Sequence, residues 1–575
     1  MNTLIPTERR HLLAVARGDE PADLVVRDAR VFSVFTREWL EGDVAVADGR
    51  FAGLGSYEGK ETVHARGSML VPGFVDAHVH VESSMLTLER FAEVVLAHGT
   101  TTVVADPHEL ANVVGADGVH WLLDAAAQVP LNVFVMAPSC VPASRFESPR
   151  GPLDTDDMQG ILRRDGALGV AEMMDFPAVI AGDPAALRKI AAPGATHVDG
   201  HAPGVTGHAL NAYLAAGIAS DHEATTYEEA LEKRRKGAWI LIREASNARN
   251  LEALLPLVRR YGPERCAFCT DDREADVLFD EGHIDGMCRT AVAAGVEAED
   301  VLVLASLGGA ACHGLRDIGA IAPGYRADFA LLPNAEFRPS RVYKDGRLAA
   351  ADGEAIPIDT PPLPGWLTDT VRVGPLAASD FGIPAGGGPV RVIELVPDQL
   401  LTGSGTEQPR IAGGLALADP ARDLAKIAVI ERHHASGRIG RGFVRGFGLR
   451  DGAFASTVSH DAHNIILVGA SDDDMEVCVR RLAEIGGGIV VARAGGVLAE
   501  LALPVAGLMS DRPGAEVAAA LGDLRAAARS LGVTVRAPFM ALSFLGLSVI
   551  PSLKITDRGL IDVDRFEIVP LMVEG

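Results

Sequence analysis

The chain has 575 residues, of which 48% are hydrophobic and 23% charged, a composition typical of a soluble globular protein with two or three domains. Its 77 acidic residues exceed its 53 basic residues and give a formal charge of −24, which argues against nucleic acid or an anionic membrane surface as a partner. Glu8 and Arg9 interrupt any apolar signal segment, and no later stretch is long and uncharged enough to cross a membrane, so we expect a cytoplasmic protein with six reduced cysteines.

Residues from about 20 to 70 consist of short β-like runs separated by turns, and they predict a small β domain. After Pro72 the pattern changes to apolar strands that alternate with amphipathic helices, which is typical of parallel βαβ units. Eight such units can be counted, enough for one closed (β/α)8 TIM barrel. Their strand candidates are residues 70–80, 101–109, 132–139, 167–176, 196–203, 218–224, 239–246 and 266–272.

The remaining segments predict two further domains around this barrel. Residues 318–365 return to short strands and turns, and we expect them to complete a discontinuous small β-sandwich domain begun by residues 1–70. The barrel would then span residues 71–317. A border rich in proline and glycine leads into residues 366–575, where strands and helices are mixed as in an α+β domain. The predicted fold class is therefore α/β, with additional β-sandwich and α+β domains.

Metal-binding residue types stand where the barrel strands are expected to end. His78 and His80 follow the first strand with a spacing of two, which points both imidazoles the same way. A carboxylate or an imidazole also stands at the ends of the fourth, fifth, sixth and eighth strands. Because the carboxyl ends of barrel strands meet on one face, these groups should lie together, and such a mixture suits divalent transition metals. The candidate ligands are His78, His80, Glu172, His201, His222 and Asp271.

The motif PGFVDAHVH, with the later histidines and aspartate, resembles the amidohydrolase superfamily. In many binuclear members the bridging ligand from the fourth strand is a carboxylated lysine, whereas Glu172 stands at this place here. This departure and the segments HVHVESSM, GVAEMMDFPAVI and FCTDDR make the chain similar to the bacterial adenine deaminases. Beyond the barrel, STVSHDAHNIILVG and SFLGLSVIPSLKITDRGLIDV resemble the C-terminal domain of that family, so the resemblance covers most of the chain.

The resemblance implies a hydrolase of purine salvage that converts adenine and water to hypoxanthine and ammonia, by attack of a metal-bridging hydroxide on C6. It implies two divalent metal ions, manganese or iron in preference to zinc, and a homo-oligomer, either a dimer or a tetramer. One ion would lie among His78, His80, Glu172 and Asp271, and the other among Glu172, His201 and His222. The implied catalytic residues are Asp271, Glu172 and His222, with Asp271 accepting a proton and relaying it to the departing ammonia.

Several assignments stay open on the sequence alone. Strand alternation lets only one of Asp271 and Asp272 face the metals, and the preference for Asp271 rests on the family pattern. A group that protonates N1 of the purine ring is expected among the carboxylates just beyond the strand ends, which could equally be surface groups. His108 could contact the substrate, bind a metal or serve the structure. The candidates for substrate contact are Glu82, His108, Glu109, Glu223 and Asp272.

Two further motifs invite a functional interpretation. Ser459, His460 and Asp461 have the residue types of a catalytic triad, but consecutive residues on an extended segment point in alternating directions. We expect instead a loop that helps to close the barrel mouth, or a structural turn. Cys266 and Cys269 form a single CxxC inside an apolar strand, which favours packed thiols over a zinc site. The alternatives to adenine deamination are another binuclear amidohydrolase, acting on a different nucleobase or cyclic amide, and a non-catalytic scaffold.

Overall fold

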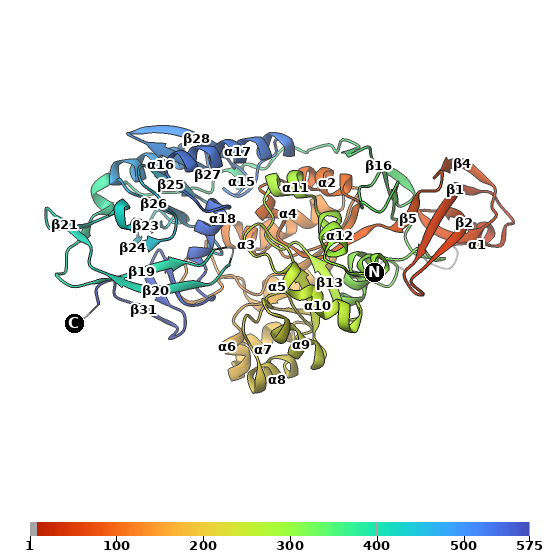
Figure 1. The fold of residues 1–575 in the computed structure, drawn as a ribbon, viewed down its shortest axis with the longest axis horizontal. Coiled ribbons are helices and arrows are strands. Elements are labelled where there is room, and N and C mark those ends of the chain that lie inside the picture. Colours follow the sequence, from red (N-terminus) through yellow and green to blue (C-terminus); the bar gives the residue numbers. More distant parts are fainter. Residues whose placement is uncertain (1–8, 398, 574–575) are drawn as a thin grey trace.

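The computed structural model of the chain describes residues 9–397 and 399–573. Residues 1–8 of the expected first domain, and residues 398, 574 and 575 of the expected third, lie outside the described residues. The molecule is elongated, with the N-terminal strands at one end, a helix-rich central part, and the C-terminal part at the other end (Figure 1). Within the two described ranges, no helix combines the length and the apolar character that crossing a bilayer requires.

Strands from before and after the central part share one sheet, preceded by helix α1 (Arg10–Arg17). Its members are β1 (Ala22–Ser33), β2 (Glu38–Ala47), β3 (Arg50–Gly55), β4 (Gly59–His64), β5 (Met69–Pro72), β14 (Phe329–Leu332), β15 (Arg341–Lys344), β16 (Arg347–Ala351) and β17 (Glu354–Ala355). Strand β5 pairs antiparallel with β14, so that Leu70 lies opposite Leu331. The sequence predicted a sandwich; hydrogen bonds connect all nine strands in a single sheet, whose core includes Phe51 and Phe329.

Eight parallel strands form the central part, in the chain order that the repeats predicted. They are β6 (Phe74–Val79), β7 (Thr100–Ala105), β8 (Asn132–Ala137), β9 (Ala167–Met173), β10 (Val198–Gly200), β11 (Ser220–Asp221), β12 (Trp239–Arg243) and β13 (Cys266–Cys269). Most of their residues are buried, as expected for parallel strands with helices on their outer face. Hydrogen bonds arrange them in a five-stranded sheet, β10-β9-β8-β7-β6, and a three-stranded sheet, β11-β12-β13.

The two parallel sheets meet at both of their edges. At one edge Val79 forms a parallel bridge with Asp271, whose amide donates a hydrogen bond to the His78 carbonyl at 3.0 Å. At the other edge the Ala219 amide donates to the Val198 carbonyl, also at 3.0 Å. Because all eight strands run in the same direction, these contacts bring their carboxyl ends to one face of the central part.

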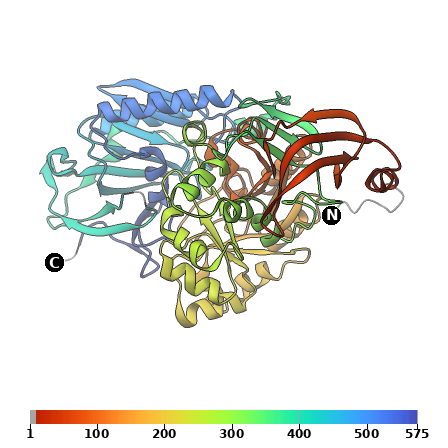
Figure 2. The same ribbon diagram turned by 45° about the vertical axis from the view of Figure 1, so that its right-hand side comes forward.

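Helices connect the strands and cover their outer faces (Figure 2). Asp154 begins α5 (Thr155–Leu162) by accepting hydrogen bonds from the amides of Asp156 and Asp157, and Gly262, with φ of 74°, ends α10 (Leu251–Tyr261). The helices of the central part are α2 (Leu88–Ala97), α3 (His108–Val114), α4 (Ala116–Ala126), α5 (Thr155–Leu162), α6 (Phe176–Ala181), α7 (Pro184–Ile190), α8 (Gly207–Ala215), α9 (Tyr227–Arg235), α10 (Leu251–Tyr261), α11 (Ala275–Glu281), α12 (Ile284–Ala293), α13 (Ala298–Val303) and α14 (Gly309–Cys312).

The C-terminal part mixes strands and helices, as predicted. Its helices are α15 (Gly365–Thr368), α16 (Asp472–Glu484), α17 (Gly514–Ser530) and α18 (Pro538–Ser543). Its main sheet has the order β20-β19-β24-β23-β26-β25-β27-β28, with strands β19 (Val390–Leu395), β20 (Thr402–Glu407), β23 (Ala425–Ile430), β24 (Ile439–Arg445), β25 (Ala453–Ser456), β26 (Ile465–Gly469), β27 (Gly488–Arg493) and β28 (Gly496–Ala502). Two three-stranded sheets complete it, from β18 (Ile383–Pro384), β21 (Arg410–Ala412) and β22 (Leu415–Leu417), and from β29 (Leu553–Thr556), β30 (Gly559–Asp562) and β31 (Glu567–Val569).

The C-terminal part is docked directly on the central part. Helix α17 packs against α11, and both figures show it running along the upper side of the molecule. Arg525 on α17 forms ion pairs with Glu274 and Asp276, each at 2.9 Å. A parallel bridge between Leu86 and Ser510 adds a backbone contact nearby. The docking therefore combines apolar packing, charge and backbone hydrogen bonding.

Gly200 lies at the tight edge between β10 and β11, and its replacement tests that edge. A Cβ atom at Gly200 would lie 2.3 Å from the Ser220 carbonyl oxygen and 2.6 Å from Ile218 Cγ2. We expect Gly200→Ala to force the strands apart and to reduce the free energy of unfolding by about 1–3 kcal/mol, seen as a lower thermal midpoint. The control is Gly160→Ala in α5, where nothing lies within 4 Å of the added atom and the midpoint should stay or rise. Equal midpoints for both variants would contradict the prediction.

Candidate active site

The six predicted metal-binding residues lie together at the carboxyl ends of five central strands. His78 and Glu172 are on β6 and β9, and the other four lie one or two residues beyond the ends of β6, β10, β11 and β13. All six side chains are almost completely buried. The hydrophobic strands place these polar groups in the interior, where each ionised group needs a partner. The six are His78, His80, Glu172, His201, His222 and Asp271.

One half of this cluster is formed by two imidazoles and two carboxylates. His80 Nε2 lies 3.2 Å from His78 Nε2, 3.1 Å from Asp271 Oδ1 and 3.4 Å from Glu172 Oε1. His80 Nδ1 donates a hydrogen bond to the Asp106 carbonyl at 2.9 Å. In a neutral His80 this bond leaves a lone pair on Nε2, directed at the centre of the group.

The other half of the cluster is built around the second oxygen of Glu172. Glu172 Oε2 lies 2.6 Å from His201 Nδ1 and 3.3 Å from His222 Nε2. Glu172 therefore turns one carboxylate oxygen toward each pair of imidazoles. A carboxylate in this position can bridge two cations.

The donor set fits divalent metal ions. Ligand atoms about 2.1 Å from a tetrahedral ion lie about 3.4 Å from one another, close to the separations found around His80. Two imidazole nitrogens that face each other as acceptors repel, and a cation between them removes that repulsion. The cluster contains imidazole and carboxylate groups without a thiolate, a set that divalent transition metals accept. The buried groups are thus consistent with a metal site.

Four of the five predicted substrate-contact residues line a small cavity beside this cluster. The cavity is small: the space between its walls is about 260 Å³, which includes space open to solvent. Glu82 is the exception, because it is absent from the cavity wall and its Oε1 accepts a hydrogen bond from the Leu110 amide at 3.0 Å. Burial raises the pKa of Glu82 to about 7. The four that line the cavity are His108, Glu109, Glu223 and Asp272.

Asp271 and Asp272 both line the cavity, although strand alternation predicted that they would point in different directions. The reason is local: β13 ends at Cys269, and Asp271 has a φ of 54°, in the left-handed region. Alternation no longer applies there. Asp271 faces the imidazoles of the cluster, whereas Asp272 Oδ1 lies 3.1 Å from His460 Nε2.

Arg243, the last residue of β12, belongs to the site and was missed in the sequence. Its guanidinium donates to Asp271 Oδ2 at 2.7 Å and to Glu223 Oε2 at 3.0 Å. Burial alone would raise the pKa of Asp271, but Arg243 and the neighbouring imidazoles outweigh burial and hold that pKa well below its ordinary value. The sequence signal was a charged residue at a strand end, overlooked because an arginine does not bind metals.

The C-terminal part forms one side of the cavity, in agreement with the first of the two alternatives for the segment around Ser459, a loop near the barrel mouth or a structural turn. His460 and Asp461 line the cavity with the apolar side chains of Leu400, Phe544 and Leu547. The triad geometry is absent from this described segment, since His460 Nδ1 lies 2.6 Å from Ser543 rather than near Ser459. The segment thus contributes two residues to the wall of the cavity at the ends of the central strands.

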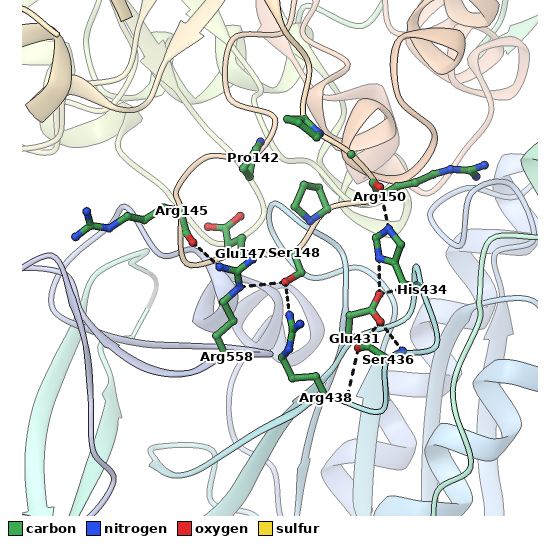
Figure 3. Close-up of a pocket in the computed structure, with 13 residues that line it drawn as sticks. Pro142, Arg145, Glu147, Ser148, Arg150, Glu431, His434, Ser436, Arg438 and Arg558 are labelled. Carbon is green, nitrogen blue, oxygen red and sulfur yellow. Dashed lines mark hydrogen bonds and ion pairs between the residues drawn. The ribbon is translucent and has the colours of Figure 1, made fainter. Parts of the chain in front are cut away.

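A second hollow shows how this segment is anchored to the central part (Figure 3). Arg438 donates to Ser148 Oγ at 2.9 Å and pairs with Asp557 at 2.8 Å, and Arg558 donates to the same hydroxyl at 3.2 Å. The Asn464 side chain donates to the Ser148 carbonyl at 3.1 Å. The loop after β8 and the C-terminal part are thus joined beside the segment that enters the cavity.

Lys554 supports the apolar side of the cavity from within the C-terminal part. Its ammonium donates to the carbonyls of Leu400, at 2.7 Å, and Phe544, at 3.0 Å. Burial lowers the pKa of Lys554 from 10.5 to about 7. The backbone positions of two residues of the cavity wall are therefore stabilised by one buried amine.

Comparison with protein families gives two matches. A model described as "Amidohydrolase family" matches residues 69–349, and one described as "Adenine deaminase C-terminal domain" matches residues 399–567. The first range contains all six clustered residues, and the second contains the segment that closes the cavity.

Curated relatives match along nearly the whole chain. An adenine deaminase of Desulfatibacillum aliphaticivorans is 47% identical over 565 residues, covering 97% of this chain and 99% of the relative. An adenine deaminase of Cereibacter sphaeroides is 46% identical, again covering 97% and 99%. Among solved structures, one titled as an adenine deaminase is 15% identical with a TM-score of 0.44, covering 57% of this chain and 99% of that chain.

Removal of Arg243 should destabilise the protein strongly. Arg243→Met leaves Asp271 and Glu223 buried without their cation, so we expect the free energy of unfolding to fall by about 3–5 kcal/mol. Arg243→Lys should lose less, since it keeps the charge. The control is Arg480→Met, which removes an exposed ion pair with Glu476 and should cost less than about 1 kcal/mol. Thermal unfolding of all three variants checks the order, and a loss for Arg243→Met no larger than for Arg480→Met would contradict it.

The buried amine of Lys554 should make stability depend on pH. Its pKa is about 7 in the folded protein and 10.5 without burial, so between these values the unfolded chain holds the extra proton. The free energy of unfolding of the wild type should therefore rise with pH relative to Lys554→Met, by about 1.4 kcal/mol per pH unit at most. Denaturant unfolding of both proteins at pH 7, 8 and 9 measures this difference. A difference independent of pH would show that Lys554 is not neutralised by burial.

Proposed function

The chain belongs to the adenine deaminase family, and from this premise we propose that it hydrolyses adenine to hypoxanthine and ammonia. The observation that carries the proposal is the position of Glu172, with one carboxylate oxygen toward each pair of imidazoles, beside a cavity suited to a small ligand. The near full-length identity to curated adenine deaminases supports the choice of substrate.

The cluster is proposed to hold two divalent ions. His78, His80, Glu172 and Asp271 would hold one ion, and Glu172, His201 and His222 the other. We expect manganese or iron, because mixed imidazole and carboxylate groups suit these metals. Such ions lower the pKa of water toward neutrality and so supply hydroxide at physiological pH.

Asp271 is proposed to accept the proton that the attacking water loses and to pass it to the departing ammonia. Two contacts support this role: Oδ1 faces the imidazoles, and Oδ2 is held by Arg243. Arg243 keeps the carboxylate ionised, and the proposed ions would make the water acidic enough to lose its proton to this weak base. Glu172 and His222, the other proposed catalytic residues, fix the geometry on the opposite side of the cluster.

Attack at C6 places electron density on N1, and a hydrogen-bond donor is needed there. Glu223 is paired with Arg243, and Glu109 lies against His460 and His463, so both carboxylates serve better as acceptors. His108 lines the cavity and lies 3.6 Å from Glu172 Oε1. Its ring nitrogens lie 3.1 Å from Asp106 Oδ2 and 3.2 Å from Glu109 Oε1. We assign His108 a contact with the substrate.

The finer architecture is also a proposal. The bonds at both edges of the parallel sheets support one closed (β/α)8 barrel over residues 71–317. The shared sheet of β5 and β14 supports a first domain formed by residues 1–70 and 318–365, and residues 366–575 would form the third. A homo-oligomer, dimer or tetramer, stays a prediction.

Metal removal and two substitutions test the function. Metal-loaded wild type should form hypoxanthine from adenine, lose this activity with a chelator and regain it with manganese or iron. Glu172→Ala should lose metal and activity together, and Asp271→Asn should lower kcat by about 10²- to 10⁴-fold. The control is Asp523→Asn, on the exposed side of α17, which should keep full activity. If the wild type forms no hypoxanthine, or both site variants stay fully active, the proposal is wrong.

A further inference from the structure

The segment between β25 and β26 is rigidly held where it enters the cavity. The His460 amide donates to Ser543 Oγ at 3.1 Å, and the His463 amide donates to the Ser459 carbonyl at 2.7 Å. Asn464 Oδ1 accepts from the Arg432 amide at 3.1 Å. The direction of each side chain in this segment is therefore set by the fold.

Two imidazoles of the segment are already partnered. His460 Nε2 lies 2.9 Å from Glu109 Oε1 and 3.1 Å from Asp272 Oδ1, and His463 Nε2 contacts the other oxygen of Glu109. His460 also packs against the Phe544 ring, with centroids 4.6 Å apart. These contacts satisfy the two histidines and leave Asp461, which lies between them in the chain.

Asp461 is a buried carboxylate without a protein donor. It is 1% exposed, lines the cavity, and neither of its oxygens has a hydrogen-bond partner in the part of the chain that the structure describes. Its nearest imidazole nitrogen, His108 Nε2, is 3.6 Å away, beyond hydrogen-bond distance. A buried carboxylate without donors is costly, so the donor is expected to come from the occupant of the cavity.

The position of Asp461 indicates which side of the ligand it meets. The His108 ring lies between Asp461 and the cluster of predicted metal-binding residues. Its Nδ1 lies 3.6 Å from Glu172, and its Nε2 lies 3.6 Å from Asp461. The reacting carbon must lie beside Glu172, so the opposite side of the ligand faces Asp461. Apolar side chains complete this end of the cavity and suit a flat ring: Met174, Leu400, Phe544 and Leu547.

We propose that Asp461 is a specificity-determining residue that accepts a hydrogen bond from an imidazole-ring N–H of the bound purine. This inference rests on the proposed function, which puts C6 of adenine beside Glu172. The C-terminal part thereby selects adenine over purines that carry a substituent on that ring nitrogen. Such a substituent replaces the N–H donor and would collide with the wall of the cavity. The loss of this hydrogen bond leaves a buried polar group unpaired and lowers affinity by about 10- to 100-fold.

Kinetics of Asp461 variants test the assignment. Asp461→Ala should raise the KM for adenine by about 10- to 100-fold with a much smaller change in kcat. The reason is that the contact stabilises the bound substrate and the transition state to the same extent. Asp461→Asn keeps an acceptor oxygen and should lose less. Asp557→Asn is the matched control, since Asp557 is a buried carboxylate paired with Arg438 outside the cavity; its KM should stay within about twofold of wild type even if its thermal midpoint falls.

Inhibitor binding separates this inference from the proposed function. Calorimetry with purine, 7-methylpurine and 9-methylpurine should show that methylation of one ring nitrogen weakens binding to the wild type by about 10- to 100-fold and that Asp461→Ala removes most of this difference. An equal methylation penalty in both proteins, an unchanged KM, or the loss of one metal ion from Asp461→Ala would each overturn the assignment. A wild type that binds purine but does not deaminate adenine would instead refute the function.

Discussion

The burial of carboxylates and imidazoles at one place is the constraint on which the surrounding structure depends. An ionised group that leaves water must gain a partner of opposite charge or a set of hydrogen bonds. Arg243 meets this need for Asp271 and Glu223, and the Asp106 carbonyl fixes the orientation of His80. The donor atoms of the inner cluster then point at one another with separations near those of ligands around shared ions.

Glu172 organises this cluster because its two oxygens serve different neighbours. Glu172 lies on a buried strand whose backbone hydrogen bonds fix its position. The same strand rigidity applies to His78 on β6. Two of the six cluster residues are therefore fixed within strands, and the other four follow strand ends.

The C-terminal part adds a wall to the site beyond the ends of the central strands. It contributes one imidazole, a carboxylate and apolar side chains to the cavity, and it is anchored by arginines at Ser148 and by α17 on α11. Exclusion of water strengthens electrostatic interactions inside the cavity and makes each unpaired polar group more costly. The proposed chemistry of the central strands and the proposed selection of the ligand thus lie in different parts of the chain.

The sequence by itself determined the order of the eight strands, the residues at their ends and the presence of a separate C-terminal region, because strand periodicity and residue type are local properties. It could not determine that both Asp271 and Asp272 line the cavity, since a left-handed φ after the strand overrides alternation. It also did not reveal that Arg243 pairs with two carboxylates. Nor did it predict that His460 contacts Glu109 or that Asp461 lies near His108. Those contacts join residues far apart in the chain, and only the packing of the C-terminal part on the central strands decides them.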